Sequence, residues 1–493
     1  MTAHVTIHRL PTGVPGLDDI LGGGLPEFSF NLIAGQPGSG KTTLAHQLMF
    51  SMATTERPAL YFTVLGEPPL KMLRYQQQFD FFDSEAIDSS VRFINLSDDA
   101  IAGDLDRLLK RMGDAVMQHS PAFVFVDSFR SVVRENETQG GARGDLQQFL
   151  QQLAMLMTSW QATTFLIGQY AYETDANPVF TVADGLIWLH QSVERNSMVR
   201  KMEIMKMRGQ LSLPGLHTFR IASAGVSVFP PASVAVAAKG DAALAVLAPR
   251  LPMGVPGLDD MLGGGLPRGY SLLVAGPSGS GKSILAAAFL AEGVRHGEHG
   301  VIAAFEQNPN RSRNRLVADL IAGGQVGLVE NRAADLSIDE IVFMLLREIQ
   351  RLGAKRVVID SLSGFELALA PTFREDFRES LSNMVTALAS TGVTVLMTSE
   401  LEDRYTDLRF SPYGTAFMTD AIIVQRYIEV ESRLLRVMAV VKVRASAHSD
   451  QLREFSIGAD GIHIGAMLSG QEGLLGGQPM KKRSPDPDSA RPA

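Results

Sequence analysis

Short apolar runs alternate with longer segments along the chain, in the order expected of strands followed by helices. Two of the runs lead into glycine-rich turns, and the others are rich in β-branched and aromatic residues without polar alternation. Continuous apolar runs of this kind are typical of parallel strands covered on both faces. The predicted strands are Phe30–Ala34, Ala122–Val126, Leu272–Ala275 and Arg356–Ile359, and the predicted helices are Thr42–Ala53 and Ser283–Glu292. The pattern predicts an α/β fold with doubly wound, mainly parallel sheets.

An internal repeat decides the domain organisation. Pro11–Ala45 and Pro252–Ala286 align without a gap at an offset of 241 residues, and roughly two-thirds of their positions are identical. This period is far longer than the unit of about 20–50 residues in a solenoid, so the chain is read as a duplicated domain. The predicted parts are a first domain at 1–230, a linker at 231–250, a second domain at 251–468 and a disordered tail at 469–493.

Composition and charge narrow the class of protein. With 45% hydrophobic and 20% charged residues, the 493-residue chain is expected to be globular rather than disordered or fibrous. A formal net charge of −8 argues against nucleic acid as a partner. The absence of cysteine excludes disulfides, cysteine-ligated zinc and a thiol nucleophile. Because the chain has no apolar signal-peptide core and no membrane-spanning run, we expect a cytoplasmic protein without a membrane partner.

Each copy carries the pattern G-x-x-x-x-G-K-[ST] between a predicted strand and a predicted helix. The glycines let backbone N–H groups surround a phosphate, and the helix N-terminus faces the same anion. Lys41 and Lys282 are expected to reach the β- and γ-phosphates, and the Thr42 and Ser283 hydroxyls to bind Mg²⁺. The residues expected to contact ATP are Gly35, Gln36, Pro37, Gly38, Ser39, Gly40, Lys41, Thr42 and Thr43, and Gly276, Pro277, Ser278, Gly279, Ser280, Gly281, Lys282, Ser283 and Ile284.

A second ligand for the metal is expected at the end of a neighbouring strand. Asp127 and Asp360 each end an apolar run and are each followed by serine, which makes them the candidates. The alternative is that these aspartates are helix N-caps. The chain has no N-K-x-D pattern for guanine, so adenine is the favoured base and ATP the favoured nucleotide.

Hydrolysis needs a group that polarises the attacking water. Glu67 and Glu306 follow the strand after each P-loop helix and are the candidate catalytic residues. The alternative is a solvated carboxylate in a loop.

One cationic strand near the end of each copy is a candidate for a phosphate clamp. Side chains alternate between the two faces of a strand, which places Lys206 and Arg208 on the same face. The matching face of the second copy carries Lys442, Arg444, Ser446 and His448. From spacing alone, solvated strand faces fit equally well.

The segment GVPGLDDxLGGGLP before each P-loop resembles the RecA superfamily. Its duplication, with a K-x-R strand late in each half, is similar to the KaiC-like family over about residues 5–465. The resemblance implies two tandem RecA-like ATPase domains that stack as two rings of a homohexamer, with ATP at subunit interfaces. The residues it implies as contacts to the neighbouring subunit's nucleotide are Lys206, Arg208, Lys442, Arg444 and His448.

The chain departs from the family pattern at its glutamates. That pattern has two adjacent catalytic glutamates in each domain. This chain has Gly66-Glu67 in the first copy and Glu306-Gln307 in the second, so each half keeps one of the pair. Ser212 replaces the histidine of the late motif in the first half.

The phosphorylation sites of the family also differ. Ala416 and Phe417 stand where the clock protein of this family phosphorylates an adjacent Ser-Thr pair. Ser411, Thr415 and Thr419 are the nearby hydroxyls that could substitute.

Three hypotheses follow. The first is a KaiC-like ATPase that acts as a signalling or timing switch with unidentified protein partners, with Ser/Thr autokinase activity in the second domain left open. The second is a RecA-type ATPase of recombination or DNA repair. The third is a ring scaffold closed by ATP with little turnover.

Overall fold

Two compact units, Met1–Pro230 and Pro231–Ala493, make up the computed structural model. The residues that the structure describes are 7–64, 69–97, 105–128, 143–170, 178–194, 197–231, 249–305, 315–330, 336–369, 377–401, 418–430, 432–468, 471–472 and 480–481.

The first unit is built on a sheet with nine described strands in the order β11-β10-β9-β8-β3-β7-β6-β4-β5. The strands from β8 to β5 run parallel, and β9, β10 and β11 extend the sheet antiparallel. Its elements are β1 (Arg9–Leu10), α1 (Leu17–Leu21), β2 (Leu25–Pro26), β3 (Phe30–Gly35), α2 (Lys41–Met52), β4 (Ala59–Thr63), α3 (Pro69–Gln76), β5 (Val91–Asn95), α5 (Leu105–His119), β6 (Phe123–Asp127), α7 (Arg143–Ser159), β7 (Thr163–Gln169), α8 (Pro178–Val182), β8 (Gly185–Glu194), β9 (Ser197–Met207), β10 (Leu216–Ala222) and β11 (Gly225–Phe229).

The second unit repeats this architecture. Its nine described sheet strands follow the equivalent order, β22-β21-β20-β19-β14-β18-β17-β15-β16. Its elements are β12 (Arg250–Leu251), α10 (Pro256–Met261), β13 (Leu266–Pro267), β14 (Ser271–Gly276), α11 (Lys282–Arg295), β15 (Gly300–Ala304), α13 (Arg315–Ala322), β16 (Val326–Glu330), α14 (Ile338–Leu352), β17 (Arg356–Asp360), α15 (Leu362–Ala368), α17 (Phe377–Ser390), β18 (Thr394–Glu400), β19 (Ala421–Val430), β20 (Arg433–Val443), β21 (Arg453–Gly458), β22 (Gly461–Met467), β23 (Gln471–Glu472) and β24 (Met480–Lys481).

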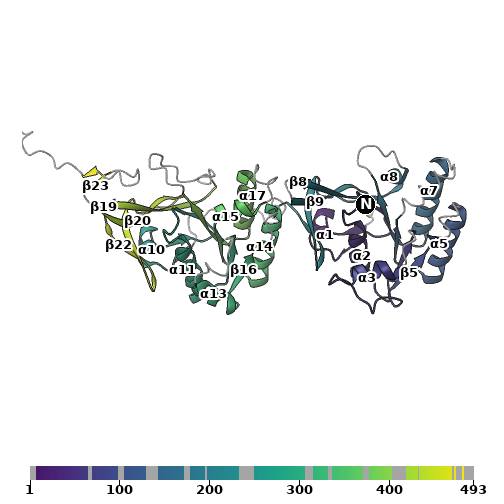
Figure 1. Ribbon diagram of the computed structural model, residues 1–493, viewed down its shortest axis with the longest axis horizontal. Helices are drawn as coiled ribbons and strands as arrows, with labels where there is room; N and C mark the ends of the chain where they lie inside the picture. Colours follow the sequence, from purple (N-terminus) through teal and green to yellow (C-terminus); the bar gives the residue numbers. More distant parts are fainter. Residues whose placement is uncertain are drawn as a thin grey trace, which may run out of the picture. The chain divides into compact units, whose positions relative to one another are not determined.

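Helices cover both faces of each sheet, as Figure 1 shows for each unit. Along β3, Leu32 and Ala34 pack into one apolar cluster with α5 and α7, and Ile33 packs into another with α2. Successive side chains of a strand point to opposite faces, so a strand buried on both sides is apolar at most of its positions. This arrangement confirms the predicted fold class, and the predicted strands and helices match observed elements to within a few residues at their ends.

The predicted disordered tail falls mostly outside the described residues. Within it the structure describes one short pairing, of Gln471–Glu472 with Met480–Lys481.

The two units carry the same ion pair with opposite polarity. In the first unit Arg57 donates to Glu27 at 2.9 Å. At the equivalent positions, 241 residues later, Arg268 donates to Glu298 at 2.5 Å. The pair links the turn before the P-loop strand to the turn before the next strand of the same unit. The contact was therefore kept while the sign of each partner was exchanged.

This exchange accommodates a buried arginine in the second unit. Arg356 begins β17, is 1% exposed and donates to Glu298 at 2.8 Å. Its guanidinium also donates to the carbonyls of Pro252 and Phe289 at 2.8 and 2.9 Å. The equivalent residue of the first unit is Phe123, which instead packs under the Arg57 guanidinium.

Replacing Arg356 with Met is expected to destabilise the second unit by about 3 kcal/mol, because it leaves buried carbonyl groups without a donor. The matched variant Arg57→Met removes a half-exposed partner and should cost the first unit less than about 1 kcal/mol. Both tryptophans, Trp160 and Trp188, lie in the first unit. Urea unfolding followed by tryptophan fluorescence therefore reports the first unit, and circular dichroism reports both. Equal losses from the two substitutions would contradict the expectation.

Candidate nucleotide sites

The two glycine-rich loops leave the carboxyl ends of the P-loop strands and enter helices α2 and α11. Gly40 and Gly281, which immediately precede these helices, have φ angles of 100° and 106°. A Cβ atom on Gly40 would lie 2.5 Å from Ile221 Cδ1, and one on Gly281 would lie 2.8 Å from Ile457 Cδ1. Left-handed backbone and close packing therefore both require glycine here. The loops have the form that the sequence pattern predicts.

The loop lysines fold back onto their own loops. Lys41 Nζ donates to the Gln36 carbonyl at 2.7 Å. Burial lowers the pKa of Lys41 to about 8, and the Asp127 carboxylate opposes that shift. Lys282 Nζ donates to the carbonyls of Gly276 and Pro277 at 2.8 and 2.7 Å. An anion placed in either loop would find the ammonium group beside it.

In the first unit the carboxylate of Asp127 lies beside Thr42, the last residue of the G-x-x-x-x-G-K-[ST] pattern. One of its oxygens accepts hydrogen bonds from Thr42 Oγ1 at 2.9 Å and from the Tyr61 hydroxyl at 2.8 Å. Asp127 is 8% exposed. Burial raises its pKa, while the two hydroxyl bonds and Lys41 oppose the shift.

This donor set fits Mg²⁺. Hydroxyl and carboxylate oxygens are the ligands that Mg²⁺ prefers, and the ion usually takes one or two from the protein and the rest from water and phosphates. Thr42 and Asp127 lie within hydrogen-bond distance of each other. Among the described residues no cluster of three acidic or histidine side chains could hold a metal alone. The geometry therefore suits a metal that arrives with a nucleotide.

In the second unit Asp360 accepts a hydrogen bond from Thr398 of the adjacent strand β18. The helix that follows, α15, has Ser361 as its N-cap, whose hydroxyl accepts from the Gly364 N–H at 3.2 Å. The alternative that Asp360 is the helix cap is therefore wrong for this unit. A cis peptide bond follows the aspartate in both units.

The late cationic residues lie at the other end of the sheet from their own P-loops. Lys206 pairs with Leu186, which pairs with Leu32, three residues or about 10 Å before Gly35. The Lys206 ammonium contacts the carbonyls of Phe180, Thr181 and Ala183, which precede β8.

The arginines of both units follow the same scheme. Arg208 pairs with Asp184 at 3.1 Å, and Arg444 pairs with Asp420 at 3.2 Å. Lys442 Nζ donates to the Thr419 carbonyl at 2.7 Å. All four cations therefore point away from the loop of their own unit.

The expectation that the second cationic segment continues as a strand to His448 is wrong. Strand β20 ends at Val443. Ala445 has a φ angle of 51°, which is left-handed and incompatible with an extended strand. Beyond it, His448 Nδ1 lies 3.0 Å from the carbonyl of Ser449. Period two therefore does not place His448 on one face with Lys442.

Several predicted residues lie outside the described part of the chain. Glu67 and Glu306, the candidate catalytic residues, are among them. So are the positions around the family's phosphorylation sites, namely Ser411, Thr415, Ala416 and Phe417. Thr419 is described and is fully buried, which argues against its side chain as a phosphate acceptor in this structure.

Sequence reasoning missed three side chains at the two sites. Tyr61 and Thr398 stand within apolar strands, where they read as core residues. Glu400 ends β18 opposite Gly276, and its charge opposes the burial that lowers the pKa of Lys282. A polar residue at the carboxyl end of an apolar strand is the signal that could have identified Glu400.

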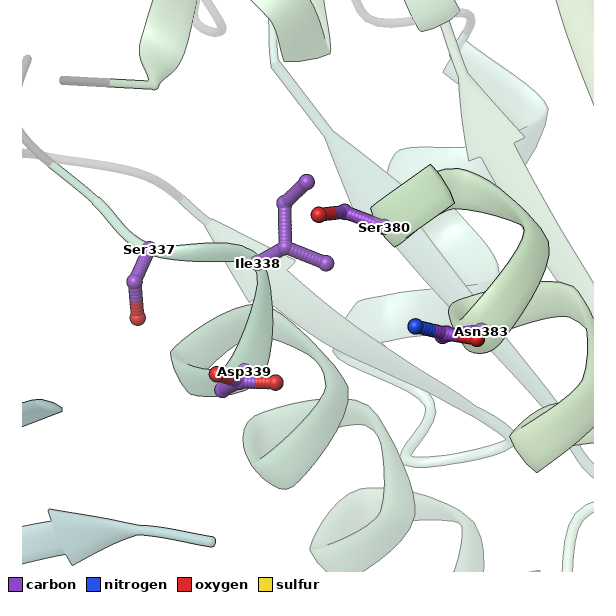
Figure 2. A pocket seen from close by; sticks show the side chains of 5 residues that line it. All are labelled: Ser337, Ile338, Asp339, Ser380 and Asn383. Carbon is purple, nitrogen blue, oxygen red and sulfur yellow. The ribbon is translucent and has the colours of Figure 1, made fainter. Parts of the chain in front are cut away.

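A small pocket lies away from both loops, between the start of α14 and helix α17. Figure 2 shows Ser380 and Asn383 of α17 facing Ile338 and Asp339. Its volume is about 60 Å³. Pockets for drug-sized ligands measure roughly 300–1,000 Å³, so this one is too small for a nucleotide.

Nearly the whole chain is similar to known proteins. The family model for the KaiC ATPase matches residues 10–233 and again residues 251–469. The chain is 26% identical over 496 residues to the circadian clock oscillator protein KaiC of Prochlorococcus marinus strain MIT 9313, covering 97% of each protein. It is 26% identical to KaiC of Rippkaea orientalis and to KaiC 1 of Synechocystis, covering 96% of this chain and 92% of each relative.

Among the helices in the described part of the chain, none combines the length and the apolar composition that crossing a bilayer requires.

The lowered pKa of Lys41 predicts a pH-dependent affinity for ATP in the first unit. Only the charged ammonium attracts phosphate, and with a pKa of about 8 its charged fraction falls from about 90% at pH 7 to about 10% at pH 9. In a chain carrying Lys282→Ala, titration with a fluorescent ATP analogue should show a loss of affinity of up to roughly tenfold over this range. Lys41→Arg in the same chain should bind independently of pH. A flat profile for the lysine chain would refute the prediction.

Proposed function

The chain belongs to the KaiC family of P-loop ATPases, and from this premise we propose that it binds and hydrolyses Mg²⁺·ATP at both glycine-rich loops as a signalling or timing switch. The observation that carries the proposal is that each unit brings a loop lysine and a strand-end aspartate to the carboxyl end of its sheet. That is where open parallel sheets bind their ligands. Duplication gives one chain two such sites.

The residues divide the work by their chemistry. Lys41 and Lys282 bind the β- and γ-phosphates, helped by the backbone N–H groups of the loops. Thr42 with Asp127, and Ser283 with Asp360, bind the metal and its water shell. Mg²⁺, when bound, neutralises charge on the phosphate oxygens. Glu67 and Glu306 orient the attacking water, each as the single carboxylate that remains of its pair.

We further propose that the sites are completed by a neighbouring copy of the chain in a homohexamer. Lys206, Arg208, Lys442 and Arg444 point away from the loops of their own units, so a nucleotide that they contact is not the one bound by their own unit, and we propose that it is bound by a neighbouring subunit. His448 is proposed for the same role in the second ring.

A cytoplasmic location fits the absence of cysteine.

Autokinase activity is a second candidate for the second unit. Ala416 and Phe417 replace the usual acceptors, so Ser411 or Thr415 would have to accept the phosphoryl group. A RecA-type DNA-repair ATPase and an ATP-closed scaffold are the competing functions.

Incubation with γ-labelled ATP and Mg²⁺ separates these functions, with label on the protein and free phosphate measured separately. We expect free phosphate, reduced in Lys41→Ala or Lys282→Ala according to which ring turns over. Protein-bound label that disappears in Lys282→Ala would establish the autokinase. Tight ATP binding without release or label would replace the proposal with the scaffold. Turnover that needs DNA, with binding that weakens steeply with salt, would replace it with the repair ATPase.

Subunit mixing tests the shared site. Two variants are made in a chain that carries Lys282→Ala, one with Lys41→Ala and one with Arg208→Ala. Each variant alone should hydrolyse ATP more slowly than the chain that carries Lys282→Ala only. Mixed and reassembled, the two variants should regain activity, because an intact loop on one subunit can meet an intact Arg208 on the next. Failure of the mixture to exceed the separate activities, with assembly confirmed by sedimentation, would rule out the contact.

A further inference from the structure

In each unit the aspartate at the metal site accepts a hydrogen bond from a hydroxyl on a neighbouring strand, but from opposite sides. In the first unit the donor is Tyr61, which lies on β4. In the second unit it is Thr398, which lies on β18. Strand β4 is one neighbour of the aspartate strand β6, and β18 is the opposite neighbour of β17.

Equivalent positions in the two units show that each hydroxyl occurs where the other is missing. Ile302 occupies the place of Tyr61 in the second unit, at the same register within its strand. Ile167 occupies the place of Thr398 in the first unit and pairs directly with Asp127. Neither isoleucine can donate a hydrogen bond. Loss of a donor on one side is thus matched by gain of a donor on the other.

The donor on β4 is not the residue opposite the aspartate. Thr63 lies opposite Asp127, but its buried hydroxyl makes no hydrogen bond with any described residue, and the donor is Tyr61, two residues earlier. Two residues span about 6.6 Å, a gap that only a long side chain with a terminal hydroxyl can cross. On β18 the donor lies beside the aspartate, so the short side chain of threonine suffices.

The Tyr61 ring is fixed by its surroundings. It is fully buried and lies 4.7 Å from the His46 ring, 5.3 Å from Phe93 and 5.9 Å from Phe125, measured between centroids. In the second unit Ala287 replaces His46, and Ile302 replaces the tyrosine. The aromatic support therefore accompanies the tyrosine.

We propose that Tyr61 in the first unit and Thr398 in the second are positioning residues that orient the metal-binding aspartate. In the first unit the Tyr61 hydroxyl holds the same Asp127 oxygen that accepts from Thr42, and in the second unit Thr398 holds one oxygen of Asp360, so each hydroxyl fixes the orientation of its carboxylate. The inference rests on the proposed binding of Mg²⁺·ATP. Partners behind a metal ligand typically change metal affinity by about 10–100-fold.

The test uses the full chain with Lys282→Ala, so that only the first loop binds a fluorescent ATP analogue. Analogue affinity is measured in EDTA, and the Mg²⁺ concentration for half-maximal binding is then titrated. Tyr61→Phe, which removes only the hydroxyl, should raise that Mg²⁺ concentration roughly tenfold and leave the affinity in EDTA unchanged.

Transplanting the second unit's arrangement is the decisive rescue. Adding Ile167→Thr to Tyr61→Phe should lower the Mg²⁺ concentration for half-maximal binding most of the way back to that of the parent chain. Folding of each variant is checked by circular dichroism. Thr398→Val in a Lys41→Ala chain should reproduce the loss at the second loop.

Three results would overturn the inference. They are an unchanged Mg²⁺ requirement in Tyr61→Phe, an equal loss of affinity in EDTA, and a folded double variant without rescue. A parent chain that binds no analogue either with Mg²⁺ or in EDTA would instead refute the proposed function on which the inference rests.

Discussion

Burial of a lysine and an aspartate at one end of a parallel sheet is the constraint on which the rest of this structure depends. Lys41 and Asp127 both have pKa values shifted toward the neutral form by burial. Such groups are costly to bury unless hydrogen bonds and opposite charge compensate them. The loop carbonyls, the Thr42 hydroxyl and the Tyr61 hydroxyl provide part of that compensation. A nucleotide with its metal would provide the remainder, so the site is built around the charge that it binds.

The sequence predicted the fold and the phosphate loops because both are local patterns. Apolar runs, glycine spacing and one lysine carry that information within a few residues. Tyr61 and Thr398 could not be found in this way, because their role depends on which strands become neighbours in the sheet. The end of the second cationic strand was missed for a related reason, since Ala445 adopts a left-handed angle that alanine rarely adopts. The candidate glutamates remain predictions, because they lie outside the described residues.

The orientation of the cationic residues links the fold to the proposed assembly. Antiparallel extension of the sheet carries Lys206 and Arg208 back to the end where β3 begins. Asp184 receives Arg208 at that end and also accepts a hydrogen bond from the Phe30 N–H at 3.1 Å. The same aspartate therefore ties the arginine to the first residue of the P-loop strand. A phosphate of a neighbouring subunit that displaced Arg208 would also act on Asp184, and through it on Phe30, the first residue of the P-loop strand.

The inverted ion pair has a consequence for how such a chain folds. Tandem repeats with similar sequences are prone to misassembly, in which a segment of one repeat docks onto the body of the other. Glu27 and Arg268 lie within the segments that are otherwise most alike. A segment exchanged between repeats would place Glu27 beside Glu298, or Arg268 beside Arg57. Two like charges would then lie side by side and repel each other. The reversed ion pair therefore disfavours docking of either segment onto the wrong repeat.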